Sequence, residues 1–504
     1  MKVLSLLLAL CLFCTWAPIR AEDDALTDIT DIFPYRVTSY DKNEMQIINN
    51  GMAALYARID LIRRAEKTLD LEYFIFNHDS AGRIILKELS QAAKRGVRVR
   101  VLVDKSKAVL ELDEYYAQVL KKHNIELRYY NAASILRLSS VQFRNHRKLI
   151  IRDGVEAITG GRNIADEYFN LSSTFNFFDR DIWISGELTS AMQESFNLYW
   201  NSKIVQIPHL VEEPTLDEFQ EDDEIAQSQF ESRLKSFNEK TQEAESIFAE
   251  NISDIHALEF AINYGQEKLK ETNKHQCPEA AFATDREGAS FWERIKSHNY
   301  HENYRLLRKE IAKWMAKANH EVILDSPYFL EDKNSRIVMD DLLSRNVKIT
   351  ILTNSLASTD AIYVSTVFNN VVSKYTPNPL FNAYIMKGEF TYDSLLMNDS
   401  ILKADWGTHA KTIVYNDDSF MVGTFNIDNR SNFYNTEMAL FCSGSPELTK
   451  DILNNIEVKK EHSHHLGVDG KPDDGSKILE GATLKKKVLY FLLKIPASIM
   501  QFLM

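Results

Sequence analysis

The chain has 504 residues, of which 44% are hydrophobic and 26% charged, so it can bury large cores in about two to three domains. Its formal net charge of −13 at pH 7 argues against a nucleic-acid partner, because proteins that bind nucleic acids normally present basic surfaces to phosphate. Only a local basic patch created by folding would change that expectation.

The N-terminus has the pattern of an export signal. Lys2 precedes an apolar run over residues 3–17, and Ala21 is followed by an acidic stretch. A basic start, an apolar segment and a small residue at the cleavage point predict that residues 1–21 are a signal peptide. An uncleaved N-terminal anchor is the alternative, although the run is short for a membrane span of about 20 residues.

The cysteines form neither a metal-binding pattern nor a disulfide framework. Cys11 and Cys14 lie within the export segment, which leaves Cys277 and Cys442 in the rest of the chain. An oxidising compartment would permit these two to pair, but nothing in their spacing requires it.

A structural pattern in the first half of the chain returns in the second half. Residues 69–74 read LDLEYF and residues 323–329 read ILDSPYF, and each precedes an amphipathic helical stretch and a further apolar strand. Apolar strands that alternate with helices predict βαβ units around buried, largely parallel sheets. Tyr73 and Tyr328 occupy matching positions in this comparison, so they either line a shared cleft or belong to the core.

Two segments also share one spacing of a His, a Lys two residues later, and an Asp or Asn five residues after that. The two sets are His146, Lys148 and Asp153, and His409, Lys411 and Asn416. A turn of small residues and a further Asn follow each set, Asn163 in the first and Asn426 in the second. Short β-branched runs predict that each motif lies on a strand, where the His and the Lys point to the same face.

Two such half-sites brought together would suit a phosphodiester. The Lys ammonium and Asn amide groups can hold phosphoryl oxygens as negative charge develops on them. One His can attack phosphorus while the other protonates the leaving oxygen, and the reversed roles let water or an alcohol release the phosphoryl group. This chemistry requires no metal and no other cofactor.

The duplicated motif resembles the mark of the phospholipase D superfamily, and further segments are similar to bacterial cardiolipin synthases of the C type. These segments are residues 94–99, 160–164, 168–169, 352–357, 430–431 and 435–438. The resemblance implies an α/β fold with two phospholipase D-like lobes, residues 45–205 and 296–460. The lobes would be related by a pseudo-two-fold axis, with one active site between them.

The family pattern also implies supporting roles. An acidic residue holds the second ring nitrogen of a catalytic His, which sets the tautomer and the ring orientation. Glu437 and Asp181 are the matching candidates, and either could instead be an ordinary carboxylate at a strand end. The acid that ends each motif, Asp153 in the first, is implied to support its strand rather than to contact phosphate.

Two features depart from the family pattern. Asn416 stands where the family usually has Asp, and a shift of one residue would bring Asp417 into that position. Gly161 and Thr424 stand where many relatives carry Ser, and only the Thr keeps the hydroxyl donor. A weakened second half-site, or a relative that only binds lipid, is therefore an alternative to a fully active enzyme.

The remaining segments predict accessory structure. Residues 206–295 are acidic and amphipathic, which predicts a helical insertion, and residues 461–483 have the composition of a linker. Residues 484–504 combine lysines with bulky apolar residues, which suits a tail in the membrane interface. A terminal helix docked on the protein's own core is the alternative, and a similar tail in C-type cardiolipin synthases favours the membrane.

The resemblance thus predicts a membrane-associated phosphatidyltransferase with a phosphatidyl-histidine intermediate. His146 is expected to be the nucleophile and His409 the general acid, after the family's usual order. The alternatives are an exported phospholipase D that makes phosphatidic acid and, less favoured by the charge, a nuclease. The expected partners are phosphatidylglycerol, phosphatidylethanolamine and a membrane surface, with no nucleic acid. The expected location is the periplasmic face of the inner membrane or the exterior.

Overall fold

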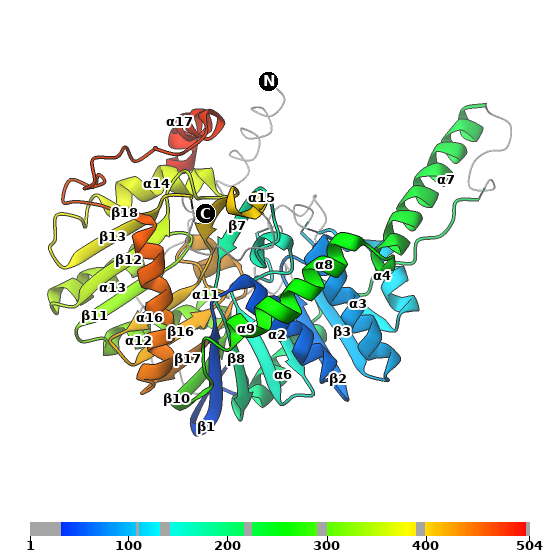
Figure 1. Ribbon diagram of the computed structural model, residues 1–504, viewed down its shortest axis with the longest axis horizontal. Coiled ribbons are helices and arrows are strands. Elements are labelled where there is room, and N and C mark those ends of the chain that lie inside the picture. Colours follow the sequence, from blue (N-terminus) through cyan, green and yellow to red (C-terminus); the bar gives the residue numbers. More distant parts are fainter. Residues whose placement is uncertain are drawn as a thin grey trace.

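One sixteen-stranded sheet runs through two α/β lobes (Figure 1). This computed structural model describes residues 32–106, 110–131, 142–215, 224–289, 300–389 and 399–499. From the outer edge to the middle, the second lobe contributes β18 (Ser463–His465), β13 (Phe381–Met386), β12 (Lys348–Asn354), β11 (Glu321–Asp325), β15 (Thr412–Tyr415), β16 (Ser419–Gly423), β17 (Met438–Ser443) and β10 (His275–Thr284). From the middle outward, the first lobe contributes β1 (Arg36–Ile48), β8 (Asp181–Gly186), β6 (Glu156–Gly160), β5 (Leu149–Arg152), β2 (Thr68–Tyr73), β3 (Arg98–Asp104), β4 (Ile125–Tyr130) and β9 (Val205–Gln206).

The strand order shows the pseudo-two-fold relation between the lobes. Counted from the two ends of the sheet, β9 corresponds to β18, β2 to β11, β5 to β15 and β8 to β17. The two halves meet where β1 pairs antiparallel with β10. Strands β2, β3 and β4 are parallel to one another, as are β11, β12 and β13. The predicted α/β class with two related lobes and βαβ units is confirmed.

Each lobe surrounds its half of the sheet with equivalent helices. The pairs are α2 (Gly51–Arg63) with α12 (Leu307–Lys317), α3 (Ser80–Lys94) with α13 (Lys333–Ser344), α4 (Glu114–Lys122) with α14 (Ile362–Val372), and α6 (Leu188–Trp200) with α16 (Pro446–Glu461). The side chains of Asp79 and Asp332 cap α3 and α13. Helices α2 to α4 pack in one lobe's core and α12 to α14 in the other's, while α6 and α16 pack on the opposite face in a core that both lobes share.

In the described part of the segment between the lobes, the helices lie between residues 224 and 269. Helix α7 (Glu224–Glu245) projects from the body of the molecule in Figure 1, and α8 (Ile252–Phe260) and α9 (Gln266–Leu269) pack on α2 and α3. Strand β10, which the sequence assigned to the insertion, is instead the innermost strand of the second lobe. Strand β1 likewise starts the first lobe before residue 45, because its long extended run pairs with both β8 and β10.

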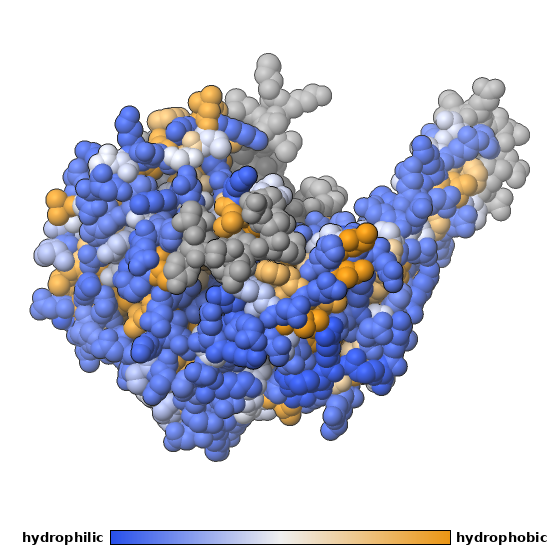
Figure 2. Space-filling model, viewed as in Figure 1, coloured by the Kyte–Doolittle hydropathy of each residue, from blue (hydrophilic) through white to orange (hydrophobic). Residues whose placement is uncertain are grey.

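The described part of the C-terminal tail is a helix docked on the second lobe, which is the alternative to a membrane-interface tail. Strand β18 lies within the predicted linker and pairs with β13. Helix α17 (Leu484–Ile499) docks on α14, where Asn369 donates a hydrogen bond to the Tyr490 hydroxyl at 3.1 Å. Its opposite side exposes an apolar stripe at i, i+4, i+7 and i+8, visible above the lobe in Figure 2. The stripe consists of Leu484 (78% exposed), Val488 (49%), Phe491 (65%) and Leu492 (67%).

The structure describes Cys277 and Cys442 but not the predicted export segment. A disulfide joins Cys277 on β10 to Cys442 on β17, the pairing that spacing alone left open. The predicted export segment, residues 1–21, lies outside the described residues, as do 216–223 of the acidic insertion and 500–504 of the tail. Among the helices that are described, none has the length and apolar character needed to cross a membrane.

Candidate active site

The two His-x-Lys motifs meet at the boundary between the lobes, and the backbone of each is hydrogen-bonded to the backbone of the opposite lobe. The His146 N–H donates to the Thr436 carbonyl at 3.0 Å, and the His409 N–H donates to the Phe178 carbonyl at 2.7 Å. The second contact extends a parallel ladder between β14 (Asp405–Thr408) and β7 (Phe175–Phe178). The pairing of β14 with β7 and the bond between His146 and Thr436 bring the four predicted His and Lys side chains to one boundary.

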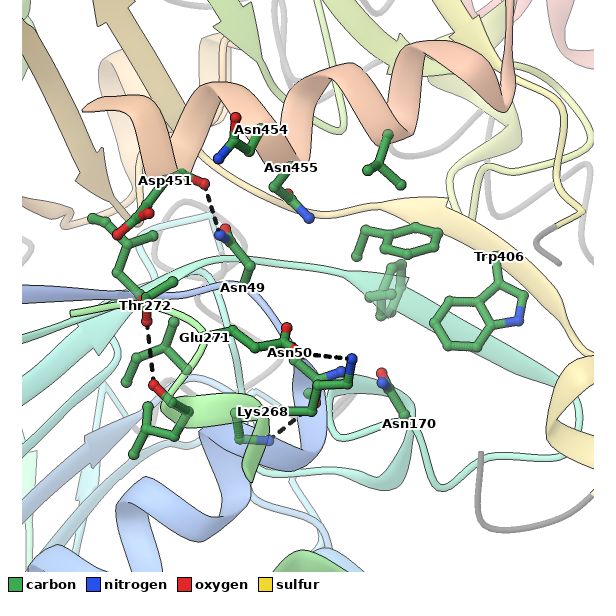
Figure 3. Close-up of a pocket in the computed structure, with 18 residues that line it drawn as sticks. Asn49, Asn50, Asn170, Lys268, Glu271, Thr272, Trp406, Asp451, Asn454 and Asn455 are labelled. Carbon is green, nitrogen blue, oxygen red and sulfur yellow. Dashed lines mark hydrogen bonds and ion pairs between the residues drawn. The ribbon is translucent and has the colours of Figure 1, made fainter. Parts of the chain in front are cut away.

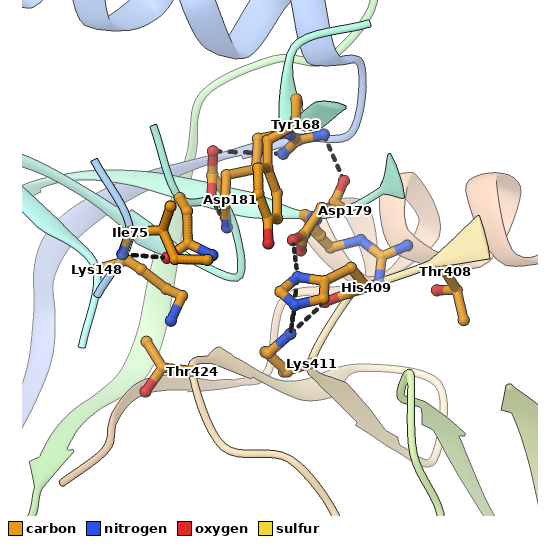
Figure 4. A network of polar contacts seen from close by, with 12 residues as sticks. Ile75, Lys148, Tyr168, Asp179, Asp181, Thr408, His409, Lys411 and Thr424 are labelled. Atoms are coloured by element: carbon orange, nitrogen blue, oxygen red, sulfur yellow. Dashed lines mark hydrogen bonds and ion pairs between the residues drawn. The ribbon is translucent and has the colours of Figure 1, made fainter. Parts of the chain in front are cut away.

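Each imidazole also meets a buried carboxylate from the other lobe. Nδ1 of His146 lies 3.0 Å from both carboxylate oxygens of Glu437 and 3.1 Å from the Thr424 carbonyl oxygen. Nδ1 of His409 lies 2.6 Å from Oδ2 of Asp179 (Figure 4). Because these oxygens only accept hydrogen bonds, the ring proton is assigned to Nδ1, which leaves the Nε2 lone pair of His146 available for attack.

The contact of Glu437 with an imidazole is therefore present, but the prediction of the same role for Asp181 is wrong. Gly160 pairs with Asp181 just as its counterpart Gly423 pairs with Ala439, so the residue that corresponds to Glu437 is Asp179. Asp181 is fully buried and forms ion pairs with two arginines, Arg58 at 2.9 Å and Arg162 at 3.3 Å. The strand register, which the sequence does not show directly, decides between the two carboxylates.

The residues after each motif shape the space around these acids. A Cβ atom at Gly161 would lie only 2.0 Å from Oδ1 of Asp179, so the absence of a side chain lets this carboxylate take its position. At the corresponding place, the Thr424 hydroxyl donates to Glu437 at 2.5 Å. Gly161 thus makes room for Asp179 in the first lobe, whereas Thr424 donates a hydrogen bond to Glu437 in the second.

The lysines and asparagines surround the two rings. Lys148 Nζ donates to the His146 carbonyl at 2.7 Å, and Lys411 Nζ lies 3.1 Å from Nε2 of His409. The Asn163 side-chain oxygen accepts from the Ile75 N–H at 3.2 Å, and the Asn163 side chain also hydrogen-bonds with Tyr168. The side-chain oxygen of Asn426 is buried and has no hydrogen-bond partner among the described residues.

Burial sets the protonation of the site. It lowers the pKa of both imidazoles well below the ordinary value, and the nearby lysines lower it further. It also lowers the pKa of Lys148 strongly and that of Lys411 to about 8, and it raises the pKa of Glu437 to about 7. Two buried lysines beside neutral imidazoles would be stabilised by a bound anion, which suits a phosphodiester.

The acid at the end of the first motif supports the backbone. Asp153 accepts hydrogen bonds from the N–H groups of residues 66, 67 and 68 at 2.7–3.1 Å. Asn416 accepts from the N–H groups of Asn319 and His320 at 3.1 and 3.2 Å, the corresponding turn of the second lobe. Asp417 is not recruited, because it lies on the surface beside His320. The Asn416 amide oxygen thus accepts two backbone hydrogen bonds in the second lobe, where the Asp153 carboxylate accepts three in the first.

The two tyrosines do not occupy matching places, contrary to the prediction. Phe76 bridges to Ile164 as Phe329 bridges to Ile427, so Tyr328 corresponds to Ile75 and not to Tyr73. Tyr73 is fully buried in the first lobe's core, where Arg58 donates to its hydroxyl at 3.2 Å. Tyr328 is partly exposed, and its hydroxyl donates to Asp360 at 3.0 Å.

Aromatic residues beside the imidazoles were not identified from the sequence. Phe74 packs against the His146 ring with centroids 5.2 Å apart, and Tyr168 packs against the His409 ring at 5.1 Å. Figure 4 shows the Tyr168 hydroxyl pointing toward the space between the two lysines. The similarity of the segment around Tyr168 to the family was a signal for it, but the sequence contained no comparable signal for Phe74.

A cavity of about 250 Å³ lies behind this site at the lobe boundary (Figure 3). Its polar wall consists largely of Asn49, Asn50, Asn170, Asn454 and Asn455. Arg180 donates to two of them, Asn49 and Asn455, at 2.7 and 2.8 Å, which ties this wall to the residue next to Asp179. None of the predicted site residues lines the cavity. Within the described ranges, no group of His, Cys, Asp and Glu side chains has the arrangement of a metal site.

The fold and the site together define a two-lobed enzyme of the phospholipase D type, with one His-x-Lys half-site in each lobe. Residues 58–200 and 311–459 match the family described as "Cardiolipin synthase, PLD-like domain", and the chain belongs to this family.

Similar proteins span most of the chain. A protein of Helicobacter pylori strain J99 with no assigned function is 28% identical over 470 residues, 88% of this chain and 85% of its own. Cardiolipin synthase C of Escherichia coli is 26% identical over 401 residues, 78% of this chain and 79% of its own. The crystal structure of phosphatidylserine synthase from Haemophilus influenzae has the same fold, with a TM-score of 0.60 at 14% identity, over 91% of this chain and 95% of that one.

Proposed function

We propose that the chain is a membrane-associated phosphatidyltransferase of the cardiolipin synthase type that forms a phosphatidyl-histidine intermediate. The observation that carries the proposal is the pair of imidazoles, each with Nδ1 bound to a carboxylate of the opposite lobe and with lysines beside the rings. The relative named cardiolipin synthase C, similar over most of both chains, supports a phospholipid as the substrate.

In the first step, Nε2 of His146 attacks phosphorus and the bond from phosphorus to the headgroup oxygen breaks. His409, protonated once the phosphate anion has entered, gives its proton to that oxygen, and Asp179 stabilises the imidazolium form. Lys148 and Lys411, with the amides of Asn163 and Asn426, would hold the phosphoryl oxygens.

In the second step, the hydroxyl of a second lipid loses its proton to His409 and attacks phosphorus. The phosphorus–nitrogen bond breaks and His146 returns to its free form. Water in place of the lipid hydroxyl would produce phosphatidic acid, which is the phospholipase D alternative.

The proposed location is a membrane surface outside the cytoplasm. The exposed apolar stripe of α17, next to Lys485 and Lys487, has the character of a helix that lies in the interface of an anionic bilayer. The disulfide between Cys277 and Cys442 supports an oxidising compartment, where such bonds persist.

Product analysis tests the proposal. Purified protein is incubated with vesicles of labelled phosphatidylglycerol, with and without phosphatidylethanolamine, and the lipids are separated. We expect cardiolipin from the wild type, and neither turnover nor a labelled protein intermediate from His146→Ala. Phosphatidic acid as the sole product would replace transfer by hydrolysis, and wild-type activity in His146→Ala would contradict the histidine intermediate.

A further inference from the structure

A carboxylate on the second lobe's side of the site has no part in the mechanism described so far. Asp360 lies between β12 and α14, and its two carboxylate oxygens are 3.0 and 3.2 Å from the Tyr328 hydroxyl. The preceding loop is held in place by hydrogen bonds from the Ser355 N–H to the Ser358 hydroxyl at 2.9 Å and from Lys486 Nζ to the Thr359 carbonyl at 3.2 Å. The carboxylate is therefore presented by a rigid loop.

Asp360 belongs to a loop that lies against the second half-site. The Asn354 amide at the start of this loop donates to the carbonyl of Thr408, the residue before His409, at 2.8 Å, and Phe329, next to Tyr328, bridges to Ile427, next to Asn426. The Asp360 side chain is exposed to solvent, yet the surrounding protein removes enough water to raise its pKa, with Lys411 and Lys486 close enough to oppose the shift. Tyr328 and Tyr363 show the same combination of partial exposure and a raised pKa caused by burial. Asp360, Tyr328 and Tyr363 therefore form a partly exposed group of polar side chains on the second lobe.

At the position that corresponds to Tyr328, the first lobe carries an apolar side chain. Ile75 occupies the position of Tyr328, and Phe74 next to it packs on the His146 ring. The two half-sites are equivalent around the phosphate but differ on the side where each lobe meets the rest of the substrate. A phosphodiester of a phospholipid has two unlike substituents, a diacylglycerol and a polar headgroup, so unlike walls can orient it.

We propose that Asp360, together with Tyr328, binds the polar headgroup of the phospholipid substrate through the headgroup's hydroxyl or ammonium hydrogens. This inference rests on the proposed function and deepens it. A carboxylate only accepts hydrogen bonds, so it selects headgroups that donate them and repels a second phosphate or carboxylate. The phosphate would lie at Lys411, and the headgroup would extend from there toward Asp360.

This orientation also assigns the two histidines. The headgroup oxygen leaves on the second lobe's side, where His409 and Lys411 lie, and His146 approaches phosphorus from the first lobe. The general acid is then His409 and the nucleophile His146, an order that the symmetric half-sites do not decide by themselves.

The test compares headgroups that differ in hydrogen-bond donors. Release of headgroup from phosphatidylglycerol, phosphatidylethanolamine and phosphatidylmethanol is measured with the wild type and with Asp360→Asn, which has nearly the same size. We expect kcat/KM of the variant to fall about 10- to 100-fold for the two donor-bearing lipids. For phosphatidylmethanol, whose headgroup has no donor, we expect a change of less than about threefold. Tyr328→Phe should shift the same ratio in the same direction by a smaller factor.

Each outcome bears on the inference. A larger loss with phosphatidylethanolamine identifies an ammonium as the preferred ligand, and a larger loss with phosphatidylglycerol identifies a polyol. Equal losses, or no loss, for all three lipids would overturn the subsite. A wild type that releases headgroup from none of the three would instead refute the proposed function. Asp417→Asn, at an exposed carboxylate beside His320, serves as the matched control and should leave all three rates unchanged.

Discussion

Replacement of Asp179 by Asn tests the cross-lobe pairing of acid and imidazole most directly. Oδ1 of Asp179 accepts a hydrogen bond from the Arg180 N–H at 2.7 Å, and Oδ2 is 2.6 Å from His409 Nδ1. In Asp179→Asn only one of the two positions can be an oxygen. If the oxygen stays with the Arg180 N–H, the amide nitrogen faces His409 and forces the ring proton from Nδ1 onto Nε2.

The expected loss is large because the whole function of the imidazole depends on that tautomer. A wrong tautomer in a comparable acid–imidazole pair lowers kcat about 10⁴-fold, or about 5 kcal/mol of transition-state stabilisation. We expect a loss of about 10³- to 10⁴-fold for Asp179→Asn, with little change in stability, since size and packing are preserved. With a lipid whose headgroup is p-nitrophenol, which leaves without a proton, the Asp179→Asn variant should regain part of its lost rate in the first step.

Asp181→Asn is the matched control, at the carboxylate that the sequence favoured. It weakens buried ion pairs with Arg58 and Arg162, and the loss of one buried partner costs about 3–5 kcal/mol of stability. We expect a lower free energy of unfolding in urea, but near-normal kcat per folded molecule. If Asp179→Asn retained more than a tenth of wild-type kcat, or if only Asp181→Asn lost it, the cross-lobe assignment would be refuted.

Three further predictions concern other parts of the chain. Asn416→Asp should leave kcat within about twofold and raise the free energy of unfolding by about 0.5–1 kcal/mol in urea titrations, because a charged acceptor strengthens the bonds to two backbone N–H groups; a tenfold change in kcat would contradict this. Because burial lowers the pKa of Lys411 to about 8, kcat/KM should fall above pH 8 as the ammonium is lost. A flat profile of kcat/KM up to pH 10 would argue against that fall. Between pH 8 and 10.5, the ordinary pKa of a lysine, the unfolded chain keeps the proton that the folded protein loses, so the contribution of Lys411 to the free energy of unfolding should rise with pH. Phe491→Asp combined with Leu492→Asp should weaken co-sedimentation with anionic vesicles at least about tenfold, whereas Ile252→Asp, at an exposed apolar residue of α8, should not.

The sequence by itself determined the chemistry of the site and the duplicated architecture. Side chains two residues apart in an extended chain point the same way, so each His and its Lys were expected to share a face. In the structure the two motifs directly precede β5 and β15 and do not lie within them. The apolar strands around them and the repeat of LDLEYF as ILDSPYF indicated two α/β lobes. The spacing of His and Lys and the pattern of apolar strands are local properties of the sequence, so they can be predicted from local backbone geometry alone.

The tertiary structure decided which residues act together across the lobes. Asp179 rather than Asp181 meets His409 because β8 pairs with β6 in one register, and a shift of two residues keeps the same face but changes the neighbour. Tyr73 is buried in the core while Tyr328 stays partly exposed, because the repeats align two residues away from their apparent match. Strand register and the pairing of β7 with β14 depend on contacts between residues far apart in the chain, and no local spacing encodes them.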